Sequence, residues 1–232
     1  MKKVYKSSGN MLCAMVVDYT TFKDYKEQPF KWKFWAHVIR KKTRAMDHIL
    51  ELGCTHGYIF SYLKEYKNKS GVDISHAAIE HAKKINPLAN FSVMDAEKLA
   101  FEDEAFQLVL CIDMIEHVKN PEACIQEAYR ILKKGGYVII TTPNPESYSR
   151  KKKGLKWFAF QDPTHISIYE IKKWTELLEK NNFVIENATT IDLFDMPYFS
   201  KWFQGINWFL YTIRHPFIPR YGDNSVFIAR KR

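Results

Sequence analysis

The segment with the most chemical information runs from Ile49 to Gly57 and reads Ile-Leu-Glu-Leu-Gly-Cys-Thr-His-Gly. Its apolar start predicts a buried strand, and its glycines predict a tight turn into a helix that begins near Tyr58. Such a turn brings bare backbone close to a ligand, and the first N–H groups of the helix favour a phosphate or a carboxylate. By itself the segment predicts only a turn that binds a negative group.

Asp73 narrows the prediction, because it lies at the end of the next expected strand, roughly twenty residues further on. An ionised carboxylate there can accept hydrogen bonds from both hydroxyls of a ribose, which indicates a nucleoside ligand. A dinucleotide fingerprint needs a glycine where Thr55 stands, so that backbone can approach a pyrophosphate. NAD is therefore disfavoured.

These residues must be positioned by an α/β fold. From residue 47 onward, short apolar runs alternate with helical patterns, which is typical of βαβ units around a parallel sheet. The expected strands are Asp47–Leu52, Lys69–Asp73, Asn90–Met94, Phe106–Ile112, Tyr137–Thr142, Phe183–Ile191 and Ser225–Arg230.

Two helices between these strands carry recognisable start signals. Asn120 precedes Pro121, which is a favoured first helical residue, and we expect Gly135 and Gly136 to end this helix. Ser167 and Glu170 form an S-x-x-E capping box, and the helix that follows is expected to run to about residue 181. Apolar residues at helical spacing follow each start: Cys124, Ile125, Ala128, Ile131 and Leu132 in the first, and Ile171, Trp174, Leu177 and Leu178 in the second.

We expect a single domain with two decorations. Residues 47–194 and 224–232 form the sheet core, residues 1–46 a helical N-terminal cap, and residues 195–223 a helical insertion. The insertion has one apolar face but is interrupted by polar residues, so it cannot span a bilayer. It is interpreted as a lid over an apolar substrate, a peripheral membrane contact through residues 197–213, or a helix packed on the sheet.

Composition excludes several classes of protein. Hydrophobic residues make up 46% and charged residues 26% of the 232, which argues against a disordered or a membrane-spanning chain. The net charge of +9 could attract nucleic acid, but the basic residues are scattered and lack the pattern of an RNA-binding module. The four cysteines form no CxxC pair, so we expect reduced thiols and no metal site. Without a secretory signal at the N-terminus, the expected compartment is the cytoplasm.

Several motifs occur in the same order as in a known family. Beyond the turn and Asp73, the chain has Met94-Asp95-Ala96-Glu97, then Phe106 to Val118 with an Ile-Glu-His-Val end. Leu132-Lys133-Lys134-Gly135-Gly136 and Thr142-Pro143-Asn144 follow. From about Asp47 to Phe183 the sequence resembles the class I S-adenosylmethionine-dependent methyltransferases, especially the group that includes the ubiquinone-biosynthesis methyltransferases. Thr55 in place of the usual middle glycine is the one departure.

The resemblance implies a Rossmann-like sheet with strand order 3-2-1-4-5-7-6, helices on both faces and an antiparallel last strand. It implies S-adenosylmethionine as cofactor, with Asp73 on the ribose, Asp95 on the adenine amine and the backbone of Ala96 near a ring nitrogen. Glu51 fixes the glycine turn or binds the methionine amino group. The full cofactor set that we predict is Glu51, Gly53, Cys54, Gly57, Asp73, Ile74, Asp95, Ala96 and Ile112.

Candidate catalytic residues follow the fourth and fifth strands. A hydroxyl acceptor would benefit from a general base, and His117 and His165 are the candidates. The alternative for His117 is a packing role at a helix start. Asp113 is expected to orient the acceptor, to balance the sulfonium charge or to cap a helix.

The sequence thus predicts a methyltransferase that acts on an oxygen, nitrogen or carbon of a small or lipid-like acceptor. Two rival hypotheses remain. An RNA methyltransferase would explain the positive charge, but the chain lacks an N-P-P-Y-type motif after the fourth strand and an appended RNA domain. A non-catalytic protein that keeps the fold is disfavoured by the intact set of glycines and acids.

Overall fold

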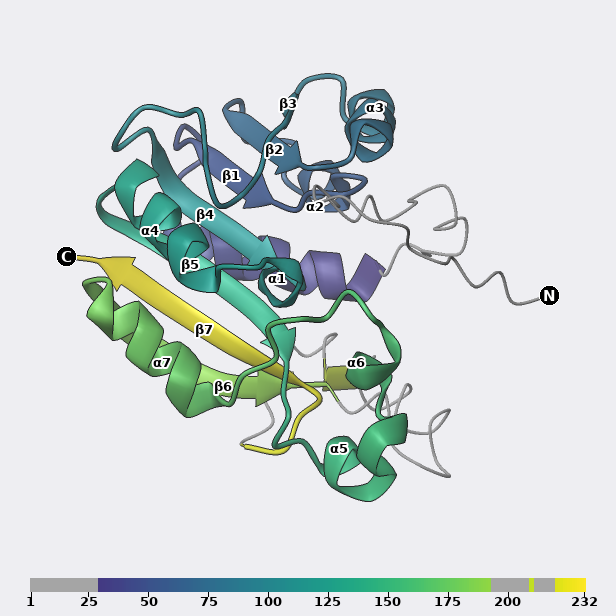
Figure 1. Cartoon of the computed structure of the whole chain (residues 1–232). Coiled ribbons are helices and arrows are strands. Elements are labelled where there is room, and N and C mark those ends of the chain that lie inside the picture. Colours follow the sequence, from purple (N-terminus) through teal and green to yellow (C-terminus); the bar gives the residue numbers. More distant parts are fainter. Residues whose placement is uncertain (1–28, 193–208, 211–219) are drawn as a thin grey trace, which may run out of the picture.

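One seven-stranded sheet forms the centre of this computed structural model, which describes residues 29–192, 209–210 and 220–232 (Figure 1). Its strands are β1 (Ile49–Leu52), β2 (Lys69–Asp73), β3 (Asn90–Val93), β4 (Phe106–Ile112), β5 (Leu132–Pro143), β6 (Phe183–Ile191) and β7 (Asn224–Lys231). The strand order is β3-β2-β1-β4-β5-β7-β6, and β7 runs antiparallel to both of its neighbours. The predicted fold class, strand order and orientation are confirmed.

Helices cover both faces of the sheet. They are α1 (Pro29–Lys42), α2 (Tyr58–Ser61), α3 (His76–Ile85), α4 (Pro121–Ile131), α5 (Tyr148–Lys153), α6 (Phe158–Gln161) and α7 (Ile171–Lys180), with short 3₁₀ helices η2 (Ile115–His117) and η3 (Gly154–Lys156). In Figure 1, α4 and α7 lie in front of the sheet and α1 behind it. Trp35 and Phe60 are buried in the core on the α1 face, and Trp174 and Phe227 in the core on the α4 and α7 face.

The register brings the ends of the parallel strands to one edge of the sheet. Leu52 of β1 is paired with Val72 of β2 and with Cys111 of β4. Ile112, at the end of β4, is paired with Thr141 of β5. Every residue of β1 and β2 is buried, as expected for strands covered on both faces. The loops that follow β1, β2, β4 and β5 therefore meet at this edge, which we call the carboxyl edge.

The start of α4 is confirmed, but its predicted end is wrong. The Asn120 side chain accepts a hydrogen bond from Ala123 N–H, and Pro121 is the first helical residue. The helix ends at Ile131, before the glycine pair, because Leu132 is already paired with Phe106 of β4. Gly135 and Gly136 lie within β5, where the pairing with β4 is irregular.

The predicted capping box before α7 does not form. The hydroxyl of Ser167 donates to the carbonyl of Val118 and is therefore used in a contact between loops. Helix α7 starts at Ile171 with Glu170 as its capping residue, and no side chain makes a cap hydrogen bond there. The apolar stripe of the helix is confirmed, since Trp174 and Leu178 are buried.

The decorations are only partly described. Helix α1 lies within the predicted N-terminal cap, of which residues 1–28 lie outside the described part. Most of the predicted insertion, including the segment 197–213 except residues 209–210, also lies outside it. Of the helices that the structure does describe, none is both long and apolar enough to cross a membrane.

Gly136 supports a stability prediction. A Cβ atom built there would lie 2.9 Å from the carbonyl oxygens of both Gln107 and Lys133, and backbone cannot move aside cheaply. We expect Gly136→Ala to cost about 1–3 kcal/mol in the free energy of unfolding, measured by urea denaturation. A Gly136→Ala protein as stable as the parent would contradict the close approach of β4.

Candidate active site

The predicted glycine turn lies between β1 and α2 in a left-handed backbone conformation. Gly53, Thr55 and Gly57 have φ values of +65°, +42° and +63°. A Cβ atom at Gly53 would lie 2.2 Å from Cγ of Met114, so only glycine fits against the loop after β4. Thr55 adopts a conformation that a β-branched residue rarely takes, and its N–H donates to Asp73 Oδ2 at 3.0 Å. The departure from the family pattern is thus accommodated by Asp73.

Asp73 is buried at the end of β2 and holds two loops. Besides the bond from Thr55, its Oδ1 accepts from the N–H of Ser75 at 2.9 Å, just before α3. Burial raises the pKa of Asp73, and the backbone hydrogen bonds oppose that rise. A carboxylate has about four acceptor positions, so capacity for ribose hydroxyls remains beside these two bonds.

Glu51 is buried on β1, and its Oε2 has no hydrogen-bond partner among the described residues. Burial, reinforced by the charge of Asp73, raises the pKa of Glu51 well above its ordinary value. A buried carboxyl oxygen without a partner is costly in a folded protein, and a cationic ligand group would satisfy it. Glu51 therefore fits the amino group of a bound methionine moiety better than it fits a role in fixing the turn.

The other predicted cofactor residues surround the turn. Cys54 is buried and donates its N–H to the carbonyl of Val72, and burial raises the pKa of its thiol, so it supports the turn. Ile74 is 59% exposed, which leaves an apolar surface beside Asp73 that a purine ring could cover. Asp95 is exposed and Ala96 buried in the loop after β3, while Ile112 is half-buried at the end of β4.

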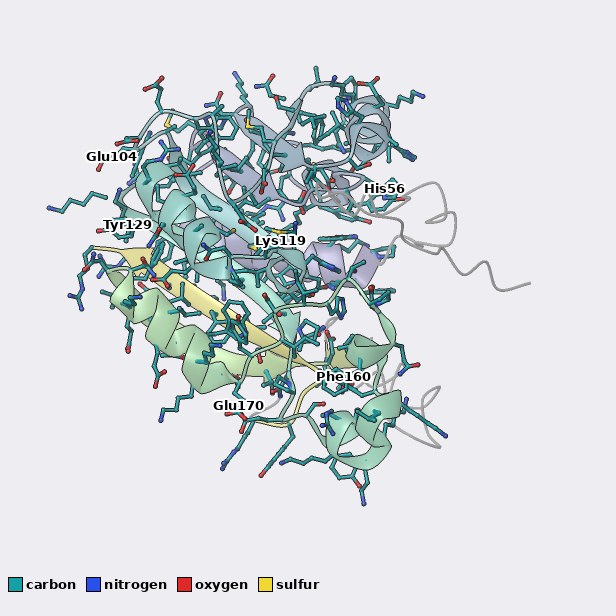
Figure 2. All side chains as sticks on the ribbon, viewed as in Figure 1. His56, Glu104, Lys119, Tyr129, Phe160 and Glu170 are labelled. Atoms are coloured by element: carbon teal, nitrogen blue, oxygen red, sulfur yellow. The ribbon has the colours of Figure 1, made fainter. Side chains whose placement is uncertain are left out.

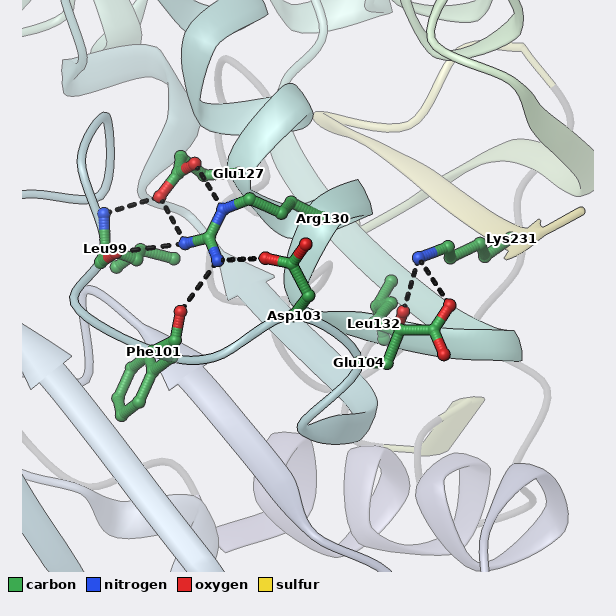
Figure 3. A network of polar contacts seen from close by, with 8 residues as sticks. All are labelled: Leu99, Phe101, Asp103, Glu104, Glu127, Arg130, Leu132 and Lys231. Atoms are coloured by element: carbon green, nitrogen blue, oxygen red, sulfur yellow. Dashed lines mark hydrogen bonds and ion pairs between the residues drawn. The ribbon is translucent and has the colours of Figure 1, made fainter.

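Arg130 of α4 holds the loop that carries Asp95 (Figure 3). Its guanidinium donates to the carbonyls of Leu99 and Phe101 at 3.0 and 2.7 Å, and pairs with Asp103 and Glu127. Glu127 in turn accepts from the N–H of Leu99 at 2.7 Å. The adenine-side loop is thus fastened by a planar group with several fixed donors, a geometry that lysine could not reproduce.

The loop after β3 is also hydrogen-bonded to the segment between η2 and α4. Oε1 of Glu97 accepts from the N–H groups of Lys119 and Asn120, at 2.8 and 3.0 Å. These residues lie between η2 and α4, two and three positions after His117. Glu97 therefore connects the loop expected to hold the adenine with the segment expected to hold the catalytic base.

Asp113 follows β4 in a left-handed conformation, with φ of +50°. Its Oδ2 accepts from Nζ of Lys31 on α1 at 2.6 Å, and its Oδ1 accepts from the hydroxyl of Thr141 at 2.6 Å. Burial acts to raise the pKa of Asp113, but the Lys31 ammonium and these hydrogen bonds outweigh it, and the pKa is lowered. Asp113 is thus an ionised, fixed group, and this environment does not suit a general base.

His117 is held in one tautomer by two residues of the α6–α7 loop. The Thr164 hydroxyl donates to Asp162 Oδ1 at 2.6 Å, so its oxygen must accept from Nδ1–H of His117 at 2.9 Å. Nε2 of the neutral ring then carries a lone pair. Burial and the neighbouring His165 lower the pKa of His117, which keeps the ring neutral at neutral pH.

His165 and Glu116 lie next to His117. The rings of His117 and His165 are in edge-to-face contact with centroids 4.6 Å apart, and Nδ1–H of His165 donates to the carbonyl of Ala159. One polar atom from each of Glu116, His117 and His165 lies within 4.8 Å of the others, a grouping that could receive a cation. Burial raises the pKa of Glu116 well above its ordinary value, so a cation there would have to displace a proton. The sequence predicted no metal and had no signal for this grouping.

Figure 2 shows the site within the whole molecule, with labelled His56 and Phe160 toward the carboxyl edge and Glu104 and Tyr129 toward the opposite end. The structure brings Glu51, Gly53 and Asp73 together, and places Asp113 beside them through Met114. His117, which follows Asp113 by four residues, and His165 are in ring contact with each other. Sequence reasoning missed Lys31, Thr141, Asp162 and Thr164, because their contacts join distant positions or pass through common hydroxyls.

Comparison with known proteins agrees with this geometry. A family model described as "Methyltransferase domain" matches residues 27–188. A ubiquinone biosynthesis O-methyltransferase from Dechloromonas aromatica is 27% identical over 191 residues, which cover 74% of this chain and 80% of that protein. Another, from Alkalilimnicola ehrlichii, is 33% identical over 108 residues, and the match spans only 44% of its length.

Among solved structures, a SAM-dependent methyltransferase from Thermotoga maritima, named as a possible histamine N-methyltransferase, superposes with a TM-score of 0.62. It is 25% identical, and the match covers 88% of this chain and 90% of that one. The chain belongs to the methyltransferase domain family, and it is an S-adenosylmethionine-dependent methyltransferase. The relatives differ in the accepting atom that their names state, so the family does not decide the acceptor.

Glu51→Gln tests the cofactor orientation. Glutamine keeps the shape but cannot offer a full negative charge, so we expect the affinity for S-adenosylhomocysteine to fall by at least about tenfold. 5′-Methylthioadenosine lacks the amino-acid portion and should bind unchanged, which makes it the internal control. Calorimetric titration measures both. An equal loss for the two ligands would instead place Glu51 in the support of the turn.

The same substitution tests the raised pKa of Glu51. A folded-state pKa above 4.5 means that the folded protein holds a proton that the unfolded chain releases as the pH rises above 4.5. Glu51 therefore destabilises the ligand-free fold increasingly from that pH up to its raised pKa. We expect Glu51→Gln to increase the melting temperature at pH 7.5 and to leave it nearly unchanged near pH 4. A stability gain independent of pH would contradict this assignment.

Arg130→Met tests the loop clamp. Losing the guanidinium releases the carbonyls of Leu99 and Phe101, so we expect faster amide hydrogen exchange in residues 95–105 and about three- to tenfold weaker binding of S-adenosylhomocysteine. Lys83→Met removes an exposed ion pair with Glu80 and serves as the matched control. Unchanged exchange in the loop after Arg130→Met would show that other contacts hold it.

Proposed function

We propose that this methyltransferase transfers the methyl group of S-adenosylmethionine to a hydroxyl oxygen of a small or lipid-like acceptor, with His117 as the general base. The observation that carries the proposal is the hydrogen-bonded series Asp162–Thr164–His117. In this series Asp162 orients Thr164, and Thr164 orients the base His117. Such an arrangement is expected where a base must remove a proton from a nucleophile. The names of the ubiquinone biosynthesis relatives, which are O-methyltransferases, point to the same accepting atom.

When bound, S-adenosylmethionine supplies a methyl group on a positively charged sulfur, ready for in-line displacement. The acceptor hydroxyl gives its proton to Nε2 of His117 as its oxygen forms the bond to the methyl carbon. Loss of the methyl group would leave the electron pair of the former carbon–sulfur bond on a neutral sulfur. The products are a methyl ether, S-adenosylhomocysteine and a proton held by His117.

The protein's residues have defined tasks in this proposal. Glu51 binds the amino group of the cofactor, Asp73 the ribose hydroxyls, and Asp95 with the Ala96 backbone the adenine. Thr164 and Asp162 hold the imidazole with Nε2 free, and they favour the imidazolium that forms once the proton has moved. His165 packs its ring edge-to-face against His117, which limits the orientations open to the base. Positioning carries much of the rate, because the displacement itself needs few side chains.

His117→Gln tests the base, with methyl transfer to a catechol, 3,4-dihydroxybenzoate, compared with transfer to histamine. We expect transfer to the catechol, with kcat reduced about 10²- to 10⁴-fold in the variant and unchanged binding of S-adenosylhomocysteine. Thr164→Val should reduce kcat about tenfold, because Nδ1 of His117 loses its acceptor. Thr164→Ser keeps the hydroxyl and should retain the parent kcat. Transfer only to histamine, or full kcat in His117→Gln, would refute the proposal.

The pH profile offers an independent check. Because the pKa of His117 lies below its ordinary value of 6.5, the base stays unprotonated down to that pH. We expect kcat/KM, which reports groups of the free enzyme, to fall as His117 gains a proton, with the half-maximal point of this acid limb below pH 6.5. An acid limb that begins well above pH 6.5 would be inconsistent with a base in this environment.

A further inference from the structure

Helix α1 brings a buried lysine to the carboxyl edge of the sheet. Lys31 has an exposed fraction of 8%, and its Nζ lies 2.6 Å from Oδ2 of Asp113. The two residues are 82 positions apart in the chain, so the contact exists only because α1 packs across the face of the sheet. A buried ammonium is costly unless it is paired, so this pair must serve the fold or the site.

Three further hydrogen bonds, all with Thr141, hold Asp113 in place within this ion pair. Thr141 donates its hydroxyl to Oδ1, and the N–H of Asp113 donates to both the carbonyl and the hydroxyl oxygen of Thr141. Lys31 also lowers the pKa of Asp113. The result is a compact pair of opposite charges in which the carboxylate is ionised and immobile.

The position of the pair connects it to the cofactor. The next residue, Met114, packs directly against Gly53 in the turn that receives the methionine portion of the cofactor. Beyond Met114 the chain continues into η2 and His117, and the charge of Asp113 acts on the pKa of His117. Asp113 therefore directly precedes the residue that packs on the turn for the methyl donor, and it lies within electrostatic range of the proposed base. A bare carboxylate at this point would act on the positive sulfur.

We propose that Lys31 is a specificity-determining residue that cancels the charge of Asp113 and thereby sets the relative affinity for S-adenosylmethionine and S-adenosylhomocysteine. The inference rests on the proposed methyl transfer at the same site. The two ligands differ by one methyl group and one positive charge on sulfur. An uncancelled carboxylate nearby would favour the charged ligand, while an uncancelled ammonium would favour the neutral one.

The cancellation has a catalytic reason. The positive charge on sulfur disperses during methyl transfer, so a negative charge beside it stabilises the ground state more than the transition state. Such a charge would tighten binding of the methyl donor and slow its reaction. By holding Asp113 in an ion pair, Lys31 lets the aspartate keep its structural bonds to Thr141 without this penalty.

A double-mutant cycle tests the inference, with calorimetric titration of each ligand and the affinity for S-adenosylmethionine divided by that for S-adenosylhomocysteine as the readout. Lys31→Met should raise this ratio about tenfold, and Asp113→Asn should lower it about tenfold. The double variant Lys31→Met/Asp113→Asn should return to the parent value, as should Lys31→Arg. Asparagine tolerates the left-handed backbone at position 113, so Asp113→Asn is expected to fold.

The opposite shifts of the two single variants are what a merely structural role cannot produce. If both variants weaken the two ligands equally, or if the double variant keeps the shift of either single one, the inference is overturned. Should Lys31→Met not fold, the Asp113→Asn and double variants decide the question alone. Turnover of the catechol by the parent protein tests the proposed function separately, because the affinity ratio needs no acceptor.

Discussion

Burial of acidic side chains at one edge of the sheet is the constraint on which the rest of the site depends. Glu51, Asp73, Asp113 and Glu116 all lie buried or half-buried at the carboxyl edge. Each must find hydrogen bonds or opposite charge, or else hold a proton. Asp73 uses backbone N–H groups, and Asp113 uses Lys31 and Thr141. Oε2 of Glu51 and Oε2 of Glu116 have no hydrogen-bond partner within the described part of the chain, and the pKa values of both side chains are raised. The edge is thus prepared for a cationic ligand.

The same constraint explains the arrangement of the loops. Asp73 cannot satisfy its carboxylate without shaping both the glycine turn and the start of α3, so the ribose position and the turn are coupled. Asp113 cannot be buried without α1, so a helix far away in the sequence completes the site. Arg130 and Glu97 then fasten the remaining loop to α4 and to the segment after His117. Cofactor side and acceptor side are therefore parts of one hydrogen-bonded framework.

The fold alone does not specify the reaction, since unrelated chemistry occurs on shared folds.

The sequence by itself indicated the alternation of strands and helices and the glycine turn, because apolar runs and glycines are local signals. The resemblance of its motifs to the methyltransferases then implied the strand order and the methyl donor. The sequence also predicted Glu51, Asp73, Asp113, His117 and His165 as the residues to examine. Its errors at the end of α4 and the start of α7 came from local rules that tertiary contacts overrode: Leu132 pairs with β4, and Ser167 bonds to Val118. Only the tertiary structure decided which groups are charged and which ring nitrogen is free. Those properties depend on burial and on distant partners. Lys31 lies 82 positions from Asp113 along the chain, and Thr164 lies 47 positions from His117.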